Sequence, residues 1–332
     1  MNVQQLKILL EVCSGKTLAE TADKLGLKQP TVSFHLRKLE EELGLPLFHK
    51  QARSLRPNDC AADLLPYARR IVSLMDEARE LMEQRRQQSF SKLKLGASYT
   101  PATYFLPPYL AEFQRLFPSV RLTLTVKKAE SVLQMLRKYE IDAGIVSLGD
   151  AEEPGVAIEP IMADELMLLL SPDHRLAARD KVEVDDLREE TFLLHETGST
   201  SRTLSEQWAG QAGLAWHSVM ELGAIETIKE AIKCNIGIGV LPRRSVLREV
   251  EAGELAMRSL PQYINRRNIC LVYREEEQLT QQVRVFIEYI RHTFLRTTGA
   301  REEERPNPPD NVLQCRIEPQ AGFGGMEHER WD

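Results

Sequence analysis

Six side chains between positions 29 and 38 carry functional groups that suit the reading of DNA bases. They fall on the outer face of one expected helix: Gln29, Thr31, Ser33, Phe34, Arg37 and Lys38. A glutamine amide pairs with adenine through two hydrogen bonds, threonine and phenylalanine can contact the thymine methyl group, and arginine and lysine reach guanine edges or phosphates. An ordinary helical hairpin with a solvated face would explain the same residues. The flanking sequence has to separate these two interpretations.

Two short helices joined by a tight turn would position these side chains. The first begins at Leu18, because Thr17 and Glu20 form a capping box that pairs otherwise free amides of the first helical turn. Gly26 ends it by supplying a left-handed conformation. The second helix begins almost at once, with Pro30 in its first turn, where the missing N–H costs nothing. Its expected buried positions recur at steps of four, three and four: Val32, Leu36, Leu39 and Leu43.

A short extended pair with basic residues near its tip follows the two helices. Residues 45 to 58 read LPLFHKQARSLRPN, which predicts two strands of a wing. Between Lys28 and Arg56 there are six basic residues and three acidic ones, in a chain of net charge −6. A small basic face on an acidic protein suits a binder that holds one DNA site without coating DNA. The candidate DNA-binding residues are Lys28, Gln29, Pro30, Thr31, Ser33, Phe34, Arg37, Lys38, Lys50, Arg53 and Arg56.

Residues 1 to 58 resemble the winged helix-turn-helix of LysR-type transcriptional regulators. In that family a QP(T/A)xS recognition helix leads into LEEELGxxLF and a basic wing. Ten positions match: Gln29, Pro30, Ser33, Leu39, Glu40, Leu43, Gly44, Leu47, Phe48 and Arg53. Three features depart from it: Lys28 replaces the usual capping serine, Phe34 replaces a basic or polar residue, and residues 57–61 replace LTxAG. Asn58 can still cap the next helix. The resemblance implies a sequence-specific DNA-binding regulator of transcription.

Residues 59 to 88 are predicted to form one long linker helix, since they contain no glycine and Pro66 lies near the first turns. At 1.5 Å per residue, roughly 30 residues make a rod of about 45 Å, too long for a small winged domain to cover. An apolar seam at steps of four and three favours pairing with a second copy, which would set two recognition helices side by side. Packing against its own domain is the alternative. The candidate dimerisation residues are Leu64, Ala68, Ile71, Met75, Ala78 and Met82.

Residues 89 to 296 alternate between strand and helix patterns, which predicts α/β units with largely parallel sheets. A polar break at 84–89 marks the hinge before them. Strands are expected at 92–96, 121–126, 142–146, 166–170, 191–194, 218–222, 238–242 and 269–273. Helices are expected at 107–117, 132–139, 201–211, 225–234 and 279–294.

The strand and helix order of this region indicates two lobes joined by two crossovers. Lobe I is expected to comprise 92–162 and 268–296, and lobe II 163–267. The region is similar to the effector-binding domain of the same family, itself like periplasmic binding proteins. The segments that carry this similarity are GASYTPATYFLP, FPSVRLTL, DAGIV and NIGIGVLP. The resemblance implies a two-lobed domain that binds a small molecule.

Short hydroxyl side chains follow three of the expected strands. They are Ser98, Thr100, Ser147, Thr197, Ser199 and Thr200. Ligands of open α/β sheets lie beyond the carboxyl ends of the strands, and several of these residues precede helices whose free N–H groups favour an anion. Helix capping explains each hydroxyl singly, but their convergence predicts an effector site. Resemblance to sulfur-metabolism regulators at GASYTPATYFLP implies a small carboxylate or another anion.

Enzymatic chemistry finds little support in the sequence. Ser98, His195 and Asp142 could be imagined as a catalytic triad, but there is no GxSxG elbow. Gly237 and Gly239 form a GxG without the third glycine and the helix start of a dinucleotide fingerprint. The seven histidines show no metal-ligand spacing such as HExxH. We therefore expect no enzyme, no cofactor and no metal.

Composition bounds the remaining properties. The chain is 42% hydrophobic without a run of about 18 apolar residues or a signal peptide, so we expect a cytoplasmic protein. Five scattered cysteines without CxxC spacing argue against a zinc site or a disulfide framework. The apolar surroundings expected for Cys234 and Cys270 predict that neither is a redox switch. Residues 297–332 are charged and rich in proline and glycine, which predicts a disordered tail.

The partners predicted from the sequence are an operator in double-stranded DNA, a small anionic effector, and further copies of the chain in a dimer or tetramer. A two-lobed small-molecule binding protein without a role on DNA is the alternative.

Overall fold

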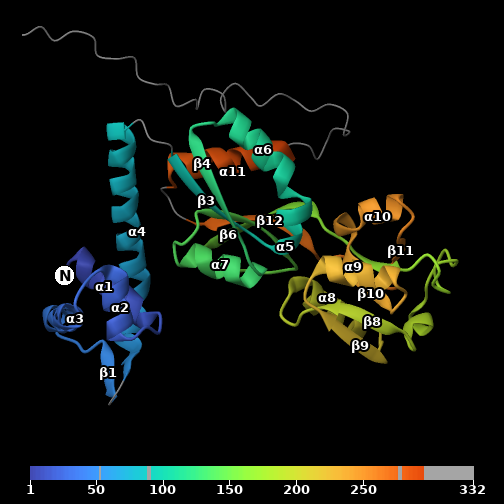
Figure 1. Ribbon diagram of the computed structural model, residues 1–332, viewed down its shortest axis with the longest axis horizontal. Helices are drawn as coiled ribbons and strands as arrows, with labels where there is room; N and C mark the ends of the chain where they lie inside the picture. Colours follow the sequence, from blue (N-terminus) through green and yellow to red (C-terminus); the bar gives the residue numbers. More distant parts are fainter. Residues whose placement is uncertain (52–53, 88–90, 276–278, 295–332) are drawn as a thin grey trace, which may run out of the picture.

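The computed structural model of this 332-residue chain describes residues 1–51, 54–87, 91–275 and 279–294. A small helical unit and one long helix lie at one end, and two α/β lobes follow along the long axis of the molecule (Figure 1). Arg53 and the predicted tail at 297–332 lie outside the described residues. Within the described part of the chain, no helix is both long and apolar enough to cross a membrane.

The N-terminal unit consists of three helices and a two-stranded hairpin. Its elements are α1 (Val3–Cys13), α2 (Leu18–Leu25), α3 (Gln29–Leu43), β1 (Phe48–Gln51) and β2 (Ser54–Pro57). The long helix α4 (Asp59–Gln87) leaves it directly and stands at its side (Figure 1). Apolar residues from all three short helices, the hairpin and α4 share one core, with Leu6, Leu9, Val32, Leu39 and Ala68 fully buried.

Lobe I is a five-stranded sheet with helices on both faces. Its elements in chain order are β3 (Ser91–Ala97), α5 (Tyr99–Tyr104), α6 (Leu106–Leu116), β4 (Val120–Val126), α7 (Ala129–Arg137), β5 (Ala143–Leu148), β6 (Val156–Ala163), β12 (Asn268–Arg274) and α11 (Gln281–Phe294). The strand order is β4-β3-β5-β12-β6, in which β12 pairs antiparallel with both of its neighbours. Helices α6 and α11 cover one face and α7 covers the other (Figure 1).

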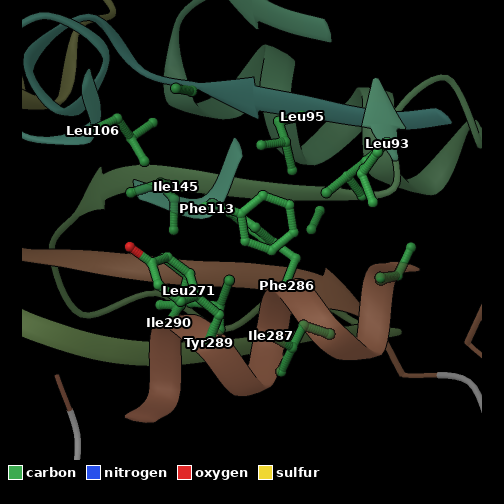
Figure 2. Packing of buried hydrophobic residues seen from close by; sticks show 14 of the residues in the cluster. Leu93, Leu95, Leu106, Phe113, Ile145, Leu271, Phe286, Ile287, Tyr289 and Ile290 are labelled. Atoms are coloured by element: carbon green, nitrogen blue, oxygen red, sulfur yellow. The ribbon is translucent and has the colours of Figure 1, made fainter. Parts of the chain in front are cut away.

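The larger core of lobe I lies between the sheet and helices α6 and α11. Figure 2 shows Phe113 of α6 beside Leu95 of β3 and Phe286 of α11. The rings of Phe113 and Phe286 meet edge to face with centroids 5.4 Å apart, and Tyr289 lies at the same distance from Phe113. Aromatic packing of this kind adds about 0.5–1.5 kcal/mol per pair to the burial term. The helix at the C-terminal end of the described chain is therefore an integral part of lobe I.

Lobe II repeats the same plan. Its elements are β7 (Leu166–Leu170), the 3-10 turn η1 (Val184–Leu187), β8 (Thr191–His195), α8 (Thr200–Gln211), β9 (Ser218–Leu222), α9 (Ile225–Lys233), β10 (Ile238–Pro242), η2 (Arg243–Ser245), α10 (Leu247–Glu251) and β11 (Ala256–Ser259). The strand order is β11-β7-β10-β8-β9, with β8, β9 and β10 parallel. Helix α8 packs on one face of the sheet and α9 on the other.

The chain passes between the lobes twice, after β6 and before β12. The two crossings lie side by side, because the amide N–H of Asp164 donates to the carbonyl of Arg267 at 3.0 Å. Two adjacent crossing segments at the ends of strands can act as a hinge between lobes. Residues that face the gap between the lobes therefore come from segments far apart in the sequence.

The expected strands and helices of both lobes are all present, but the sequence did not reveal α5, β6, β11 or the short helix α10. β6 and β11 are edge strands, so one side of each lacks a neighbour and their burial pattern does not alternate cleanly. β6 also carries Pro160, opposite the point where the pairing register with β12 shifts. A proline without an N–H is tolerated at an edge or bulge, which disguises the strand in the sequence.

Candidate functional site: an exposed helix face and a pocket between two lobes

The helix-turn-helix is held by local contacts that the sequence predicted. The Thr17 hydroxyl accepts from the Glu20 amide at 3.2 Å, and the Thr17 amide donates to the Glu20 carboxylate at 2.8 Å. Gly26 takes the left-handed conformation at φ +64°, which a side chain would strain. Helix α3 begins two residues after Leu27 with Pro30 in its first turn. The turn thereby fixes the angle at which α3 leaves α2.

The outer face of α3 is open to solvent. Phe34 is 60% exposed, and the other exposed residues are Lys28, Gln29, Pro30, Arg37 and Lys38. Thr31 and Ser33 are half-buried. Val32, Leu36 and Leu39 hold the opposite face in the core, as expected, but Leu43 is 37% exposed, so its expected burial was wrong. It lies in the last turn of α3, where the chain turns into the wing and no element covers it.

The wing is a hairpin with the register Phe48 to Pro57 and His49 to Arg56. Arg56 is exposed on β2. Lys50 belongs to β1, but its side chain, like the whole of Arg53, lies outside what the structure describes. Basic side chains on a hairpin beside a recognition helix are placed to reach the phosphate backbone.

Hydrogen bonds fix the wing to α3. The Glu40 carboxylate accepts from the amide of Leu47 at 2.7 Å and from that of Phe48 at 3.3 Å. The Asn58 amide donates to the carbonyl of Pro46 at 2.8 Å, while its oxygen caps α4 by accepting from the amide of Ala61 at 3.0 Å. Helix and wing therefore form one rigid surface.

The linker helix α4 uses two different faces. Its first half packs against its own domain: Ala68 is fully buried there, and Leu64 and Ile71 are packed on the same core. Ala68 therefore cannot contribute to pairing with a second copy, which corrects the predicted seam. The physical reason is that α1 packs against α4, and the contact extends as far as Asp76, which forms an ion pair with Lys7 at 2.9 Å.

The exposed apolar stripe of α4 lies elsewhere on the helix. Tyr67 is 68% exposed, Leu74 54% and Met82 58%, and Met75 and Ala78 are also exposed. Large apolar side chains that are open to water over several turns mark an interaction surface. The predicted residues Met75, Ala78 and Met82 therefore stay available to a partner, whereas the first half of the predicted seam is occupied within the chain.

A small cavity of about 40 Å³ lies between the lobes. It contains five of the six predicted hydroxyl residues and further residues that the sequence did not single out. The lining residues are Ser98, Tyr99, Thr100, Lys128, Ala129, Ser147, His195, Ser199, Thr200, Ser201 and Arg267. Thr197 is not among them, because its hydroxyl turns away to donate to the Glu221 carboxylate at 2.8 Å. At about 10–15 Å³ for each water-sized group, this volume corresponds to about three or four such groups, so the cavity suits a small ligand.

Two cations that the sequence analysis missed line this cavity. Lys128 is the residue before α7 and carries no motif that marks it. Arg267 is 1% exposed and forms an ion pair with Asp164, with Nη1 and Oδ2 3.0 Å apart. Burial lowers the pKa of Arg267, but a guanidinium beside a carboxylate stays charged. Its signal in the sequence was only its position between two strand patterns, at a crossover.

The guanidinium of Arg267 is incompletely paired. Its Nη2 donates to the hydroxyl of Thr100 at 3.3 Å, whereas its Nε lacks a hydrogen-bond partner among the described residues. Oδ1 of Asp164 is likewise buried without one. A buried donor that stays unpaired costs about 1–3 kcal/mol, so Arg267 keeps hydrogen-bonding capacity that its contacts with Asp164 and Thr100 do not use.

His195 at the end of β8 is held neutral. Burial lowers the pKa of its imidazole, and the nearby positive charges of Arg267 and Lys128 lower it further, against the opposing effect of Glu196. Its Nδ1 accepts from the Glu196 amide at 3.1 Å, so the ring proton of the neutral form resides on Nε2. His195 thus offers one N–H donor and does not act as a cation.

Direct contacts close the lobes over the cavity. The Thr200 hydroxyl of lobe II donates to the Ser147 carbonyl of lobe I at 3.1 Å. Lys128 of lobe I meets the Glu196 carboxylate at 3.2 Å. Opening the lobes would break both contacts, so a bound ligand that joins the two sides would stabilise this arrangement.

A second contact between the lobes lies at the C-terminal end of α5. Tyr104 of lobe I hydrogen-bonds the Glu226 carboxylate of α9, and the ammonium of Lys229 lies 5.4 Å from the centre of the Tyr104 ring. Lys229 itself is buried between Glu226 and Glu249. Helix α5 therefore contacts the cavity with its first residues and lobe II with its last one.

The residues considered for enzymatic chemistry are not assembled for it. Asp142 accepts from the amide of Lys94 at 2.8 Å and lines a separate cavity beside α4. Gly237 and Gly239 serve close packing: a Cβ on them would lie 2.4 Å from the Thr191 carbonyl and 2.5 Å from Ile232, respectively. Close backbone and helix approach explains the GxG without any ligand.

The two cysteines that were expected in apolar surroundings differ. Cys270 is buried in β12, and burial raises the pKa of its thiol to about 11, which keeps it protonated and unreactive. Cys234 follows α9 and is exposed, so the expected apolar surroundings were wrong for this residue.

Comparisons with known proteins agree for the N-terminal unit and for the two lobes. Residues 3–62 match the family described as "Bacterial regulatory helix-turn-helix protein, lysR family", and residues 86–295 match "LysR substrate binding domain". The HTH-type transcriptional regulator CysL of Bacillus subtilis is 26% identical over 87% of this chain and 96% of its own length. The RuBisCO operon transcriptional regulator of Allochromatium vinosum is 28% identical over 87% of this chain and 95% of its own length.

Solved structures share the fold. A full-length OxyR variant from Pseudomonas aeruginosa superposes with a TM-score of 0.65 at 24% identity, covering 88% of this chain and 95% of that one. Full-length CbnR in complex with its target DNA gives 0.57 at 20% identity, covering 88% and 99%. The regulatory domain of CcmR from Synechocystis, in complex with 2-PG, gives 0.55 at 25% identity, covering 60% and 95%.

Proposed function

The chain belongs to the LysR family of DNA-binding transcriptional regulators, and we propose that it reads a two-fold symmetric operator with α3 and responds to a small anion held between its lobes. One observation carries the DNA half: the polar face of α3 is exposed while Val32, Leu36 and Leu39 bury the opposite face. A recognition helix reads base edges with its N-terminal residues. Gln29 in the first turn is therefore the leading candidate for base readout.

The remaining candidate DNA contacts divide by chemistry. Arg37 and Lys38, farther along α3, suit guanine edges or phosphates, and Phe34 suits a thymine methyl group. Arg56, with Lys50 and Arg53 of the wing, suits the phosphate backbone. CbnR, which shares the fold, was solved with its target DNA, and this supports a docking of the same kind here.

An anionic effector is supported by the charges that line the cavity. Lys128 and Arg267 contribute two cations to the described lining, and their carboxylate partners, Glu196 and Asp164, are not among the lining residues. The first residues of α7 and α8 also face the cavity, and both are long enough to direct a positive dipole end at a ligand. The similar CcmR regulatory domain was solved in complex with 2-PG, which supports a small-molecule effector for this domain.

We propose that two copies pair through the exposed stripe of α4. An aspartate at Leu74 would put a charge into an apolar interface without a partner, so Leu74→Asp should dissociate the dimer, at a cost of several kcal/mol. Light scattering checks this, with Asp63→Asn on the same helix as an exposed control. If the Leu74 variant kept its size, the pairing surface would lie elsewhere.

The same α4 pairing would place two α3 helices side by side, and a tetramer would require a further surface. We keep the division proposed from the sequence: 1–58 as the DNA-binding domain, 59–88 as the linker and 89–296 as the effector-binding domain.

The experiment that tests this function measures fluorescence anisotropy of labelled duplexes from the DNA upstream of the protein's own gene. We expect saturable binding to one duplex that survives an excess of random DNA, and a change in affinity when a small anion is added. Equal affinity for the upstream and scrambled duplexes would contradict operator recognition. An unchanged affinity with every anion that the protein binds would contradict control by the effector.

A further inference from the structure

The hydroxyl groups that line the interlobe cavity are not interchangeable, because their hydrogen-bond partners fix where each proton points. Carboxylate and carbonyl oxygens only accept hydrogen bonds, and amide or guanidinium N–H groups only donate. A hydroxyl beside a carboxylate or carbonyl oxygen must donate its hydrogen bond to that oxygen. A hydroxyl beside an amide or guanidinium N–H accepts and keeps its own proton free.

Two of the lining hydroxyls already donate a hydrogen bond to a protein oxygen. The hydroxyl of Ser147 donates to Oδ2 of Asp164 at 3.2 Å, and Asp164 is 2% exposed and anchored by Arg267. The hydroxyl of Thr200 donates to the carbonyl of Ser147 at 3.1 Å. Since both residues line the cavity, they can offer a ligand only oxygen lone pairs. These two hydroxyls act as acceptors.

Two other hydroxyls accept a hydrogen bond from a protein N–H group instead. Ser98 Oγ accepts from the Ser147 amide at 2.8 Å, and Thr100 Oγ1 accepts from Nη2 of Arg267 at 3.3 Å. Their protons remain free for a ligand. Together with the ammonium of Lys128, they form the part of the cavity that donates.

We propose that the effector is a small anion that carries its own O–H donor, so that its charged oxygens meet Ser98, Thr100 and the cations while its O–H donates to Ser147 or Thr200. This rests on the anionic effector proposed above and narrows its chemistry. The cavity is small, and hydrogen phosphate and a 2-hydroxycarboxylate of two carbons are among the smallest anions that carry an O–H. An anion without a donor could pair with neither acceptor, and a site built to hydrogen-bond an O–H rejects the analogue that lacks it.

Two pairs of anions, in each of which one member carries an O–H and the other does not, test the proposal by calorimetry on the full-length protein without DNA. Hydrogen phosphate retains an O–H that sulfate lacks, and glycolate has an O–H that acetate lacks. We expect phosphate to bind at least tenfold more tightly than sulfate, or glycolate at least tenfold more tightly than acetate. The pair that shows the difference identifies the source of the O–H.

Variants locate the effect in the cavity. Ser147→Ala removes one acceptor and should lower the affinity for the O–H anion toward that of its partner, so that the ratio within the pair falls. Thr200→Val should reduce the same ratio. Loss of lobe closure alone would weaken both anions of a pair equally, so the ratio separates recognition from closure.

Matched controls are available on α8. Ser205→Ala and Thr203→Val remove hydroxyls that also donate to carbonyls, but neither residue lines the cavity. Both should keep the wild-type ratio, and melting temperatures verify folding of all four variants.

Equal affinity within both pairs would overturn the proposal while leaving an anionic effector in place. Failure of all four anions to bind would overturn it as well. Neither outcome affects the DNA-binding proposal, because operator binding is measured separately.

Discussion

The outer face of α3 and the cavity between the lobes differ in how their recognition residues are held in place. The α3 face is a local surface, built from residues between 28 and 38, and most of its side chains are exposed, among them Gln29, Phe34 and Arg37. The cavity draws on five separate segments, and its polar groups are already bonded to each other: Asp164 holds both Ser147 and Arg267, and Arg267 holds Thr100. An exposed side chain of α3 can therefore change with little effect on folding, whereas a side chain of the cavity also contributes to the stability of the fold.

The charged side chains of the two regions also differ in their exposure to solvent. On α3 the cations Arg37 and Lys38 are exposed to solvent, where salt screens them and where long-range attraction to phosphates operates. In the cavity the buried charge of Arg267 is balanced by Asp164 at 3.0 Å. Charge in the first region attracts a partner, while charge in the second is a fixed part of the hinge.

The largest expected effect comes from breaking the hinge pair. Arg267→Ala leaves Asp164 buried without its counter-charge, which should destabilise the effector domain by about 3–5 kcal/mol. The neighbouring Arg266 is exposed and meets Asp150 only at 3.5 Å, so Arg266→Ala should cost less than about 1 kcal/mol. Thermal unfolding of both variants makes the comparison. Equal melting temperatures would show that the cavity is no more interlocked than a surface.

The next effect belongs to the α3 face. Gln29→Ala should cost about 1–3 kcal/mol on the operator and little on random DNA, because only base edges distinguish the two. Its melting temperature should match that of the wild type, since the side chain is exposed. Isotherms on operator and scrambled duplexes decide this. Equal weakening on both would mean that Gln29 does not enter the major groove.

A smaller effect of a different kind is expected from the wing. Arg56→Ala removes a candidate phosphate contact, so it should weaken operator and random DNA alike and reduce the slope of log affinity against log salt by about 0.9 per subunit. Arg53, which the sequence suggested for the same role, makes a parallel variant. Titrations at several salt concentrations measure the slope, and a loss confined to the operator would assign Arg56 to base readout instead.

The smallest expected effect is the pH response of His195. Its pKa is lowered in the folded protein, mainly by burial, so the unfolded chain binds more protons between that lowered value and the usual value of about 6.5. Stability should therefore fall as the pH decreases through this window. His195→Gln should remove that part of the decline, and melting curves from pH 7.5 to 5.5 would reveal it. If both proteins lost stability in parallel, His195 would not be the group responsible.

The sequence by itself determined the features that depend on neighbours a few residues away. The Thr17–Glu20 capping box, the left-handed Gly26 and the alternation of Val32, Leu36 and Leu39 each involve contacts within one or two helical turns. The α/β alternation was equally clear, and the rule that ligands lie beyond strand ends brought Ser98, Ser147 and Thr200 to one place. Local propensity and sheet topology suffice for such features.

Tertiary structure alone decided the rest. Arg267 reaches Thr100 across 167 residues of chain, and Lys128 reaches Glu196 across 68, so no spacing in the sequence could join them. Burial of Ala68 depends on α1 lying against α4, which a helical period cannot distinguish from pairing with a second copy. The proton direction of each cavity hydroxyl depends on the partner that folding places beside it. These properties arise only when distant segments are packed together, because a helical or strand period reports which faces are apolar and not which element covers them.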